Sequence, residues 1–192
     1  MRIEMDGGNY KKIVKACKEA AGKKNDRPTL AYACLDCEVW KVTATALDGH
    51  VLIQIPVPAN CDDFGRVLLD VNAAIKPSDL ERVIIATDND NPREVTVSCS
   101  HSGLSVKYTT PDPKDYVQHS KVWPTAEPCA KIAFDTDVMM KIVKAFKAAG
   151  EKYMQFEVAN NVSAAVVYNN DTIGLVLPVR STGTVRPEHY DK

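Results

Sequence analysis

Three segments of the sequence follow one pattern, and this repeat constrains the fold more than any other feature. Each begins with a short apolar-rich run that ends in aspartate: Arg2–Asp6, Arg66–Asp70 and Lys131–Asp135. A helical pattern follows each run, in GGNYKKIVKACKEAAGKK, VNAAIKPSDLERV and TDVMMKIVKAFKAAG. The aspartates stand at positions 6, 70 and 135, at intervals of 64 and 65 residues. Regular spacing of matched units indicates an internal structural repeat.

Three extended runs follow each helical pattern. They are TLAYACLDCE, VWKVTATAL and VLIQIPVP in the first unit, VIIAT, EVTVSCS and LSVKYTT in the second, and KYMQFEVAN, VSAAVVYN and TIGLVLPVR in the third. Short turns rich in Gly, Asn and Asp separate most of them, which is typical of hairpin-linked antiparallel strands. The sequence therefore predicts an α+β protein of three β-α-β-β-β units. Pro77 interrupts the second helix and makes it the weakest of these elements.

The first and third helical patterns each oppose an apolar face to a face of lysines, at about 100° per residue. Because the formal net charge of the whole chain is −1, the acidic residues must lie elsewhere. Lysine faces suit non-specific contact with double-stranded DNA, since lysines that neutralise phosphates release condensed counterions. A merely solvated helix surface is the alternative. The lysines are Lys11, Lys12, Lys15 and Lys18 in the first helix, and Lys141, Lys144 and Lys147 in the third.

The apolar faces of the same helices predict which side of each helix packs on a core. They comprise Tyr10, Ile13, Val14, Cys17, Ala20 and Ala21 in the first helix, and Met139, Ile142, Val143 and Phe146 in the third. The three repeat aspartates lie between a strand and a helix. This position favours capping of a helix N-terminus over a cluster of catalytic carboxylates.

The remaining chemistry-bearing residues predict neither an enzyme nor a metal site. Cys34 and Cys37 form a C-x-x-C, but no second pair is spaced to complete a zinc site. Within a strand the two thiols would point to opposite faces, so buried structural cysteines are expected. The chain lacks a phosphate-binding loop, a hydrolase nucleophile elbow and a zinc-protease motif. We therefore expect no catalytic residues, no cofactor and no bound metal.

The apolar runs are strand-sized, and none is long enough to span a membrane. The N-terminal stretch MRIEMDGGNYKK has no apolar signal-peptide core. These features predict a cytoplasmic protein without a membrane partner.

Several stretches resemble, in order, the β subunit of bacterial DNA polymerase III, the sliding clamp. RPTLAYACLD followed by VTATALDGHVLIQIP resembles the clamp's central domain with its A-T-D-G-H-R-L-A hairpin. DPKDYVQHSKVWP resembles the F-P-D-Y-R-R-V-x-P connector, and IAFDTDVMMKIVKAF, ending in TIGLVLPVR, resembles the last half-domain. The resemblance implies a DNA-clamp fold with antiparallel sheets outside and helices on the inner face. It implies a complete domain at residues 1–110, a connector at 111–128, a half-domain at 129–180 and a tail at 181–192.

The resemblance leaves the third unit without a partner. A clamp subunit has three domains of two units each, whereas this chain offers three units. An unpaired half-domain exposes a sheet edge, which proteins normally cover or pair, and this favours a homo-oligomer. A ring of different stoichiometry, pairing of the third unit with a second copy, and no ring closure are all compatible with the sequence.

The resemblance also implies a groove between the second and third clamp domains that takes a short peptide containing Gln and Leu or Phe. Gly49 permits the hairpin turn, and His50 is expected at the groove's edge. A turn histidine bonded to backbone is the alternative for His50. The family's Thr before D-G-H is Leu47 here, and its Arg after the motif is Val51. The matched groove positions are Leu30, Gly49, His50, Leu52, Lys121, Val122, Leu175, Leu177 and Pro178.

The function implied is that of a non-catalytic processivity factor in DNA replication. The groove would bind a DNA polymerase or another protein with a clamp-binding motif, and the lysine helices would contact double-stranded DNA. Such tethering raises the polymerase's effective concentration at the primer end without chemistry. The alternative is a clamp-like interaction module that forms no ring and competes for clamp-binding peptides, as a protein encoded by a mobile element would.

Overall fold

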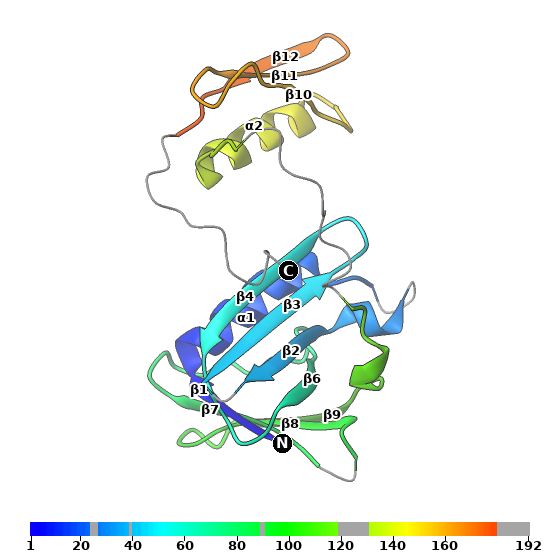
Figure 1. The fold of residues 1–192 in the computed structure, drawn as a ribbon, viewed down its shortest axis with the longest axis vertical. Helices are drawn as coiled ribbons and strands as arrows, with labels where there is room; N and C mark the ends of the chain where they lie inside the picture. The colour runs from blue at the N-terminus through cyan, green and yellow to red at the C-terminus, as the bar shows by residue number, and fades with distance from the viewer. Residues whose placement is uncertain (24–26, 39, 89–90, 119–130, 180–192) are drawn as a thin grey trace. The chain divides into compact units, whose positions relative to one another are not determined.

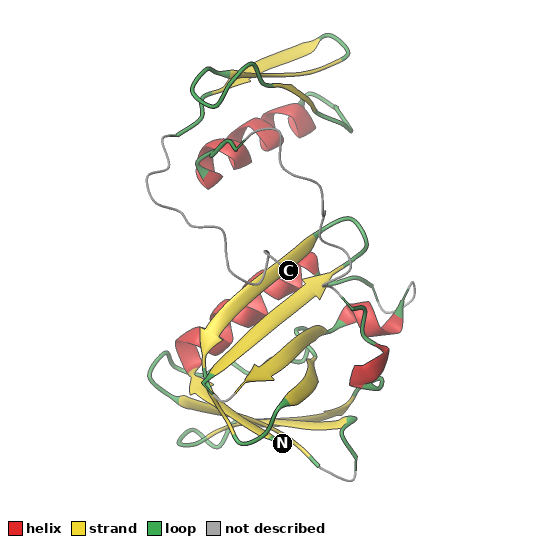
Figure 2. Ribbon diagram, in the orientation of Figure 1, coloured by secondary structure: helices red, strands yellow, loops and turns green. Residues whose placement is uncertain are grey.

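The computed structural model describes residues 1–23, 27–38, 40–88, 91–118 and 131–179. The chain divides into two compact units, residues 1–119 and residues 120–192, and each is described here by itself. Figure 1 labels the elements, and Figure 2 shows the same ribbon by type of secondary structure.

The described residues of the first unit form these elements in order: β1 (Arg2–Asp6), α1 (Gly7–Ala20), the 3₁₀ turn η1 (Pro28–Ala31), β2 (Ala33–Glu38), β3 (Lys41–Leu47), β4 (Leu52–Pro58), β5 (Asn60–Cys61), β6 (Gly65–Leu69), β7 (Arg82–Thr87), β8 (Glu94–Cys99), β9 (Ser105–Thr109) and the 3₁₀ turn η2 (Pro113–Asp115). The second unit contains α2 (Thr136–Ala148), β10 (Gln155–Glu157), β11 (Ala165–Asn169) and β12 (Thr172–Val176).

The first unit has two antiparallel sheets, and its two repeats exchange their leading strands between these sheets. One sheet has the order β5-β1-β7-β8-β9 and the other β4-β3-β2-β6. Strand β1 opens the first repeat but pairs with β7 of the second, in a register that places Ile3 opposite Ile85. Strand β6 opens the second repeat but pairs with β2 of the first, with Leu68 opposite Cys34. The two repeats therefore form one domain, in which each supplies its leading strand to a sheet of the other.

Helix α1 packs against both sheets of this domain and has the apolar face predicted from its sequence. Its Tyr10, Ile13 and Cys17 are fully buried, and Ala20 is nearly so. The side chain of Asp6 caps the helix by accepting a hydrogen bond of 2.6 Å from the Asn9 amide, as predicted for the repeat aspartates.

The helix predicted in the second repeat is absent, since residues 71–80 form no helix. Asp70 still accepts hydrogen bonds from the Asn72 and Ala73 amides, but these cap a turn that does not continue. Pro77 explains the interruption, because a proline lacks the amide proton that a helix interior requires.

The segment after Pro77 instead closes the N-terminus of α1. The Gly7 amide donates to the Glu81 carbonyl (2.7 Å), and the Gly8 amide donates to the Asp79 carbonyl (3.1 Å). The first amides of a helix have no partner within the helix, so these two carbonyls satisfy them. Lys11 adds an ion pair with Asp79.

The second unit is a single repeat with a small core. Helix α2 begins after Asp135, whose side chain accepts from the Asp137 and Val138 amides. Among the described residues of the second unit, the buried hydrophobic side chains are Phe146 of α2, Ala165 and Val167 of β11, and Val176 of β12. The strand predicted at Lys131–Asp135 is not formed, although the Val179 amide donates to the Ala133 carbonyl (2.8 Å). Strands β10, β11 and β12 form an antiparallel sheet in that order.

Cys34 and Cys37 lie on opposite faces of β2, as predicted. Cys37 joins the main core, which α1 and both sheets share, whereas Cys34 joins a second cluster on the other face of β2. Both side chains are buried, and burial raises the pKa of each thiol. They are structural residues of the strand.

Candidate functional site

The hairpin between β3 and β4 is held by Asp48. Its Oδ1 atom accepts hydrogen bonds of 2.8 Å from the amides of both His50 and Val51. These two donors lower the pKa of the Asp48 carboxyl. Gly49 has a φ of +99°, the left-handed region that glycine adopts without strain, and His50 is exposed at the tip. The hairpin turn at Asp48 and Gly49 is formed as the sequence predicted, and its polar tip is exposed to solvent.

A cavity of about 560 Å³ opens beside this tip. The structure brings three of the predicted groove positions to it, namely Leu30, Gly49 and His50. Leu30 is only 2% exposed, so it forms a floor. It lies in η1 and not in a strand as predicted, because the turn that Pro28 opens delays β2 until Ala33. The whole lining is Ala21, Gly22, Lys23, Arg27, Leu30, Asp48, Gly49 and His50.

Two cations at this cavity were not selected from the sequence. Lys23 and Arg27 line it together with Asp48, which gives the rim charges of both signs. They stand in the stretch GKKNDR between α1 and η1. The high proportion of charged residues in that stretch is the sequence feature from which these two cations could have been selected. Val51, which stands where the clamp hairpin has an Arg, is exposed and does not line the cavity.

The floor of the cavity continues into the second core cluster. Leu30, Leu47 and Cys34 belong to it, and the predicted groove residue Leu52 packs on it half-buried. Tyr116 is 2% exposed within this cluster, and its hydroxyl donates to the Thr45 carbonyl at 3.1 Å. Burial raises the pKa of the Tyr116 hydroxyl. The first part of the predicted connector therefore packs on the first unit.

The remaining predicted groove positions belong to the second unit or lie outside the described residues. Leu175 is in β12 and is 66% exposed, and Leu177 follows the strand at 69% exposed. Pro178 is half-buried. Lys121 and Val122 lie outside the described residues. Within its own unit, the end of β12 thus presents an apolar surface to solvent.

The predicted lysine faces are exposed on both helices, opposite the buried faces. The sequence Lys-Ile-Val-Lys-Ala occurs at 12–16 and again at 141–145, 129 residues later. One of the seven lysines, Lys11, is engaged by Asp79. The exposed set is Lys11, Lys12, Lys15 and Lys18 on α1, with Lys141, Lys144 and Lys147 on α2.

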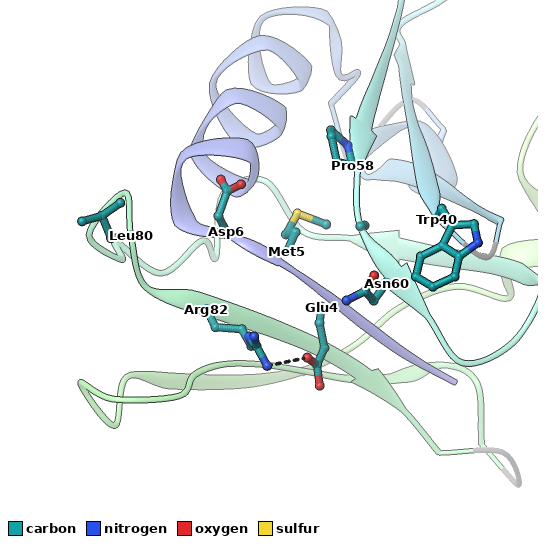
Figure 3. A pocket seen from close by; sticks show the side chains of 9 residues that line it. Glu4, Met5, Asp6, Trp40, Pro58, Asn60, Leu80 and Arg82 are labelled. Atoms are coloured by element: carbon teal, nitrogen blue, oxygen red, sulfur yellow. Dashed lines mark hydrogen bonds and ion pairs between the residues drawn. The ribbon is translucent and has the colours of Figure 1, made fainter.

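A second cavity, of about 440 Å³, lies where β1 meets β7, and Figure 3 shows it from close by. Arg82 and Glu4 form an ion pair of 3.2 Å across these two strands. Trp40 and Leu80 line the cavity, yet they are 76% and 98% exposed. Sequence reasoning did not select these residues, since no motif joins positions so far apart.

Over the described ranges, no group of three or more His, Cys, Asp or Glu side chains gathers as a metal site would require. Nor is any helix in that part of the chain long and apolar enough to cross a membrane.

No protein-family model matches the sequence, and no curated protein matches it. Solved structures do. The DNA polymerase sliding clamp of Bacillus subtilis has a TM-score of 0.72 at 15% identity, over 93% of this chain and 49% of that one. The β chain of DNA polymerase III from Streptococcus pneumoniae has 0.73 at 18% identity, over 96% and 51%. Caulobacter crescentus pol III beta has 0.64 at 16% identity, over 93% and 51%.

The similarity extends along nearly the whole described chain, although few residues are identical. This chain spans about half the length of the clamp chains that it matches. It has the fold of the bacterial DNA polymerase III sliding clamps, as the repeat and the resemblance predicted.

Proposed function

We propose that this protein is a clamp-like, non-catalytic replication factor that binds client proteins through a peptide groove and DNA through its lysine-rich helices. The observation that carries the proposal is the clamp fold itself, with TM-scores of 0.72 and 0.73 to two bacterial clamps over more than nine-tenths of the chain. Because the identities are 15% and 18%, this likeness concerns the fold, and the groove and DNA contacts are argued from the residues.

The cavity at the β3–β4 hairpin supports a peptide site. It combines an apolar floor at Leu30 with charged and polar groups at Lys23, Arg27 and Asp48. Apolar anchors in a pocket with polar groups around them are the usual anatomy of a peptide-binding surface. The exposed Leu175 and Leu177 are the anchors proposed from the second unit. The ligand is a short peptide with a Gln and a Leu or Phe.

The test is fluorescence anisotropy of a labelled peptide of this composition, titrated with the full chain. Leu177→Ala should weaken binding by about 5- to 150-fold, the equivalent of about 1–3 kcal/mol, if Leu177 is an anchor. Leu80→Ala is the control, because Leu80 is an even more exposed leucine (98% against 69% for Leu177) but lines the other cavity. Unchanged binding in Leu177→Ala with a loss in Leu80→Ala would move the peptide to the cavity of Figure 3.

The second candidate function is an interaction module that keeps the groove without encircling DNA. The observation in its favour is that the described residues of the second unit form one helix and one three-stranded sheet, whereas those of the first form two sheets. Retention on a closed circular DNA, compared with the same DNA after linearisation, separates the two. A clamp that encircles DNA slides off linear molecules, whereas a module with weak phosphate contacts is released from both as salt rises.

A further inference from the structure

The third repeat lacks neighbours that the first repeat has. The two align without gaps over their helices: Asp6 and Asp135 both cap a helix, and the identical Lys-Ile-Val-Lys-Ala sequences stand 129 residues apart. Each position of the leading segment and helix of the third repeat therefore has a counterpart in the first repeat, 129 residues earlier.

Strand β1 of the first repeat lies between two neighbours. On one side it pairs with β5, with Glu4 opposite Asn60, and on the other side with β7. In the third repeat the counterpart of Glu4 is Ala133, whose carbonyl accepts from Val179 at 2.8 Å. Val179 therefore lies on the side of residues 131–135 that corresponds to the β5 side of β1. Within the described residues, the second unit has no strand in the place of β7.

The burial of the leading segment reflects the missing neighbour. Ile3 and Met5, which face the core from β1, are 0% and 5% exposed. Their counterparts Ile132 and Phe134 are only half-buried. The sequence alternation is the same in both segments, so the difference lies in what covers them.

Strand β10 is the counterpart of β2 and β7, the strands that accept an exchanged partner in the first unit. Phe156 of β10 lies opposite Val167, which is fully buried, yet Phe156 is 42% exposed. Its neighbours Gln155 and Glu157 are exposed as well. The edge of the sheet at β10 is thus apolar on its inner face and open.

Helix α2 is likewise less buried than its counterpart α1. Tyr10 and Ile13 of α1 are fully buried, whereas their counterparts Met139 and Ile142 are half-buried. Among the described residues, large hydrophobic side chains with high exposure concentrate in the second unit. They are Val138, Met140, Val143, Tyr153, Phe156, Val158, Val162, Ile173, Leu175, Leu177 and Val179, against five in the much longer first unit.

We propose that a second copy of this chain completes the third repeat. Residues 131–135 of each copy add antiparallel to β10 of the other, as β1 adds to β7 and β6 to β2 in the first unit. The repeat carries both the strand to be donated and the edge that accepts it, which is the self-complementarity that a two-fold interface requires. The occupant is therefore the same repeat in a second molecule.

Two sheet edges of the first unit, at β4 and β9, are protected against such pairing. Strand β4 carries Pro56 and Pro58, and β9 carries Lys107, which is paired with Glu94. Prolines and charged side chains at an edge discourage addition of a further strand. Strand β10 contains no proline, and the carboxylate of its one charged residue, Glu157, accepts a hydrogen bond of 3.0 Å from the Tyr168 hydroxyl of the neighbouring strand.

The first experiment measures the mass of the full chain by sedimentation velocity and light scattering. We expect twice the 21.1 kDa of one chain at concentrations up to about 100 μM. A monomer throughout this range overturns the proposal. If the chain is a dimer, the variants described next determine which surface forms the interface.

Two variants are designed to disrupt the proposed interface, and two others serve as controls. Ile132→Pro removes an amide on the side that corresponds to β7, and Phe156→Lys places a charge on the inner face of the β10 edge. Ile132→Val keeps the amide, and Ile173→Lys places the same charge on β12, where Ile173 is 74% exposed. We expect a more than tenfold rise in the dimer dissociation constant for the first pair and no change for the second.

The folding of each variant is checked by circular dichroism. If Ile132→Pro loses helical signal, Phe156→Lys with its Ile173→Lys control decides the matter. A dimer that persists in both Ile132→Pro and Phe156→Lys overturns the proposed strand exchange. A dimer lost in Ile173→Lys but retained in Phe156→Lys would place the contact on the outer face of the sheet and also overturns it.

Discussion

Gly7, the first residue of α1, lies against the backbone of Ser78, which occupies the space that a side chain at this position would need. A Cβ atom built on Gly7 would overlap the Ser78 carbonyl oxygen. Its amide also donates to the Glu81 carbonyl, so the segment from Ser78 to Glu81 is pressed against the start of the helix. Glycine costs a helix stability relative to alanine. Here it is required by close approach of two backbone segments.

Gly7→Ala should therefore lower the free energy of unfolding of the first unit by about 1–3 kcal/mol, since backbone atoms must shift to admit the methyl group. Gly8→Ala is the control. A Cβ at Gly8 would meet Asp6 Oδ1 at 3.3 Å, a side-chain atom that can move, and alanine favours the helix by up to about 1 kcal/mol. Urea denaturation of the two variants measures the difference. Equal stabilities would contradict this account of Gly7.

Glu81 closes the same region with its side chain. The Ser102 hydroxyl and amide, together with the Ser78 amide, lower the pKa of Glu81 to about 2 from an ordinary 4.5. The amide contacts are 2.7 Å from Ser102 to Oε1 and 3.3 Å from Ser78 to Oε2. Because the folded pKa is the lower one, the contribution to stability is complete above pH 4.5 and is lost as the pH falls towards 2.

Glu81→Gln should consequently destabilise the protein at neutral pH, and the difference from wild type should shrink as the pH falls from about 5 to about 2. Urea denaturation at a series of pH values checks this. Ser102→Ala, which keeps the amide but removes the hydroxyl, should give an intermediate pH dependence. A constant difference between Glu81→Gln and wild type across the range would show that the carboxylate does not act through its pKa.

At the level of elements, the sequence predicted what local physics determines and missed what packing determines. Helices α1 and α2, with their apolar faces and aspartate caps, follow from periodicity and were predicted correctly. The second helix was wrong, because residues 71–80 pass Pro77 and close the N-terminus of α1 instead. The strand at 131–135 was wrong for another reason. A strand needs a neighbour, and the described residues provide only the Val179 contact.

The candidate site divides in the same way. The hairpin at Asp48–Gly49 follows from its turn residues. The position of Leu30 as a buried floor, and the arrival of Lys23 and Arg27 at the same cavity, depend on how α1, η1 and the hairpin pack. No local pattern encodes that convergence. Whether a peptide binds there stays a prediction.

The two lysine helices lead to a matched prediction. Replacing Lys141, Lys144 and Lys147 with Ala should flatten the salt dependence of DNA binding, by up to about 0.9 in slope per lost phosphate contact. Peptide affinity should be unchanged. The equivalent substitutions at Lys12, Lys15 and Lys18 test α1 in the same register. DNA titrations at several salt concentrations give the slopes.

Lysines on strands are the control for the loss of charge alone. Lys41 and Lys107, which pair with Glu38 and Glu94, lie outside both helix faces. If their replacement flattens the salt dependence as much as the helix variants do, DNA contact does not depend on the helices.

For the molecule as a whole, the two units should differ in stability. Among the described residues, four buried side chains form the core of the second unit, whereas the first unit has a larger core between two sheets and α1. Regions with few buried apolar contacts open at lower free energy. Amide hydrogen exchange should therefore be faster in β11 and β12 than in β2 and β3.

The same measurement at increasing protein concentration links this prediction to strand exchange. Protection in β10 and α2 should rise with concentration if a second copy covers them, while β2 and β3 should not change. Mass spectrometry of peptic fragments resolves these segments. Uniform protection of both units at every concentration would contradict the expected difference between the units.

The exchange of leading strands carries a rule of parity. In the first unit, β1 pairs with a strand of the second repeat and β6 pairs with a strand of the first, so these two repeats match each other. Three is an odd number, so in one copy of these 192 residues one repeat remains over. If leftover repeats pair two by two, any closed assembly made only of this chain contains an even number of copies. A trimer or a pentamer would always leave one repeat unmatched.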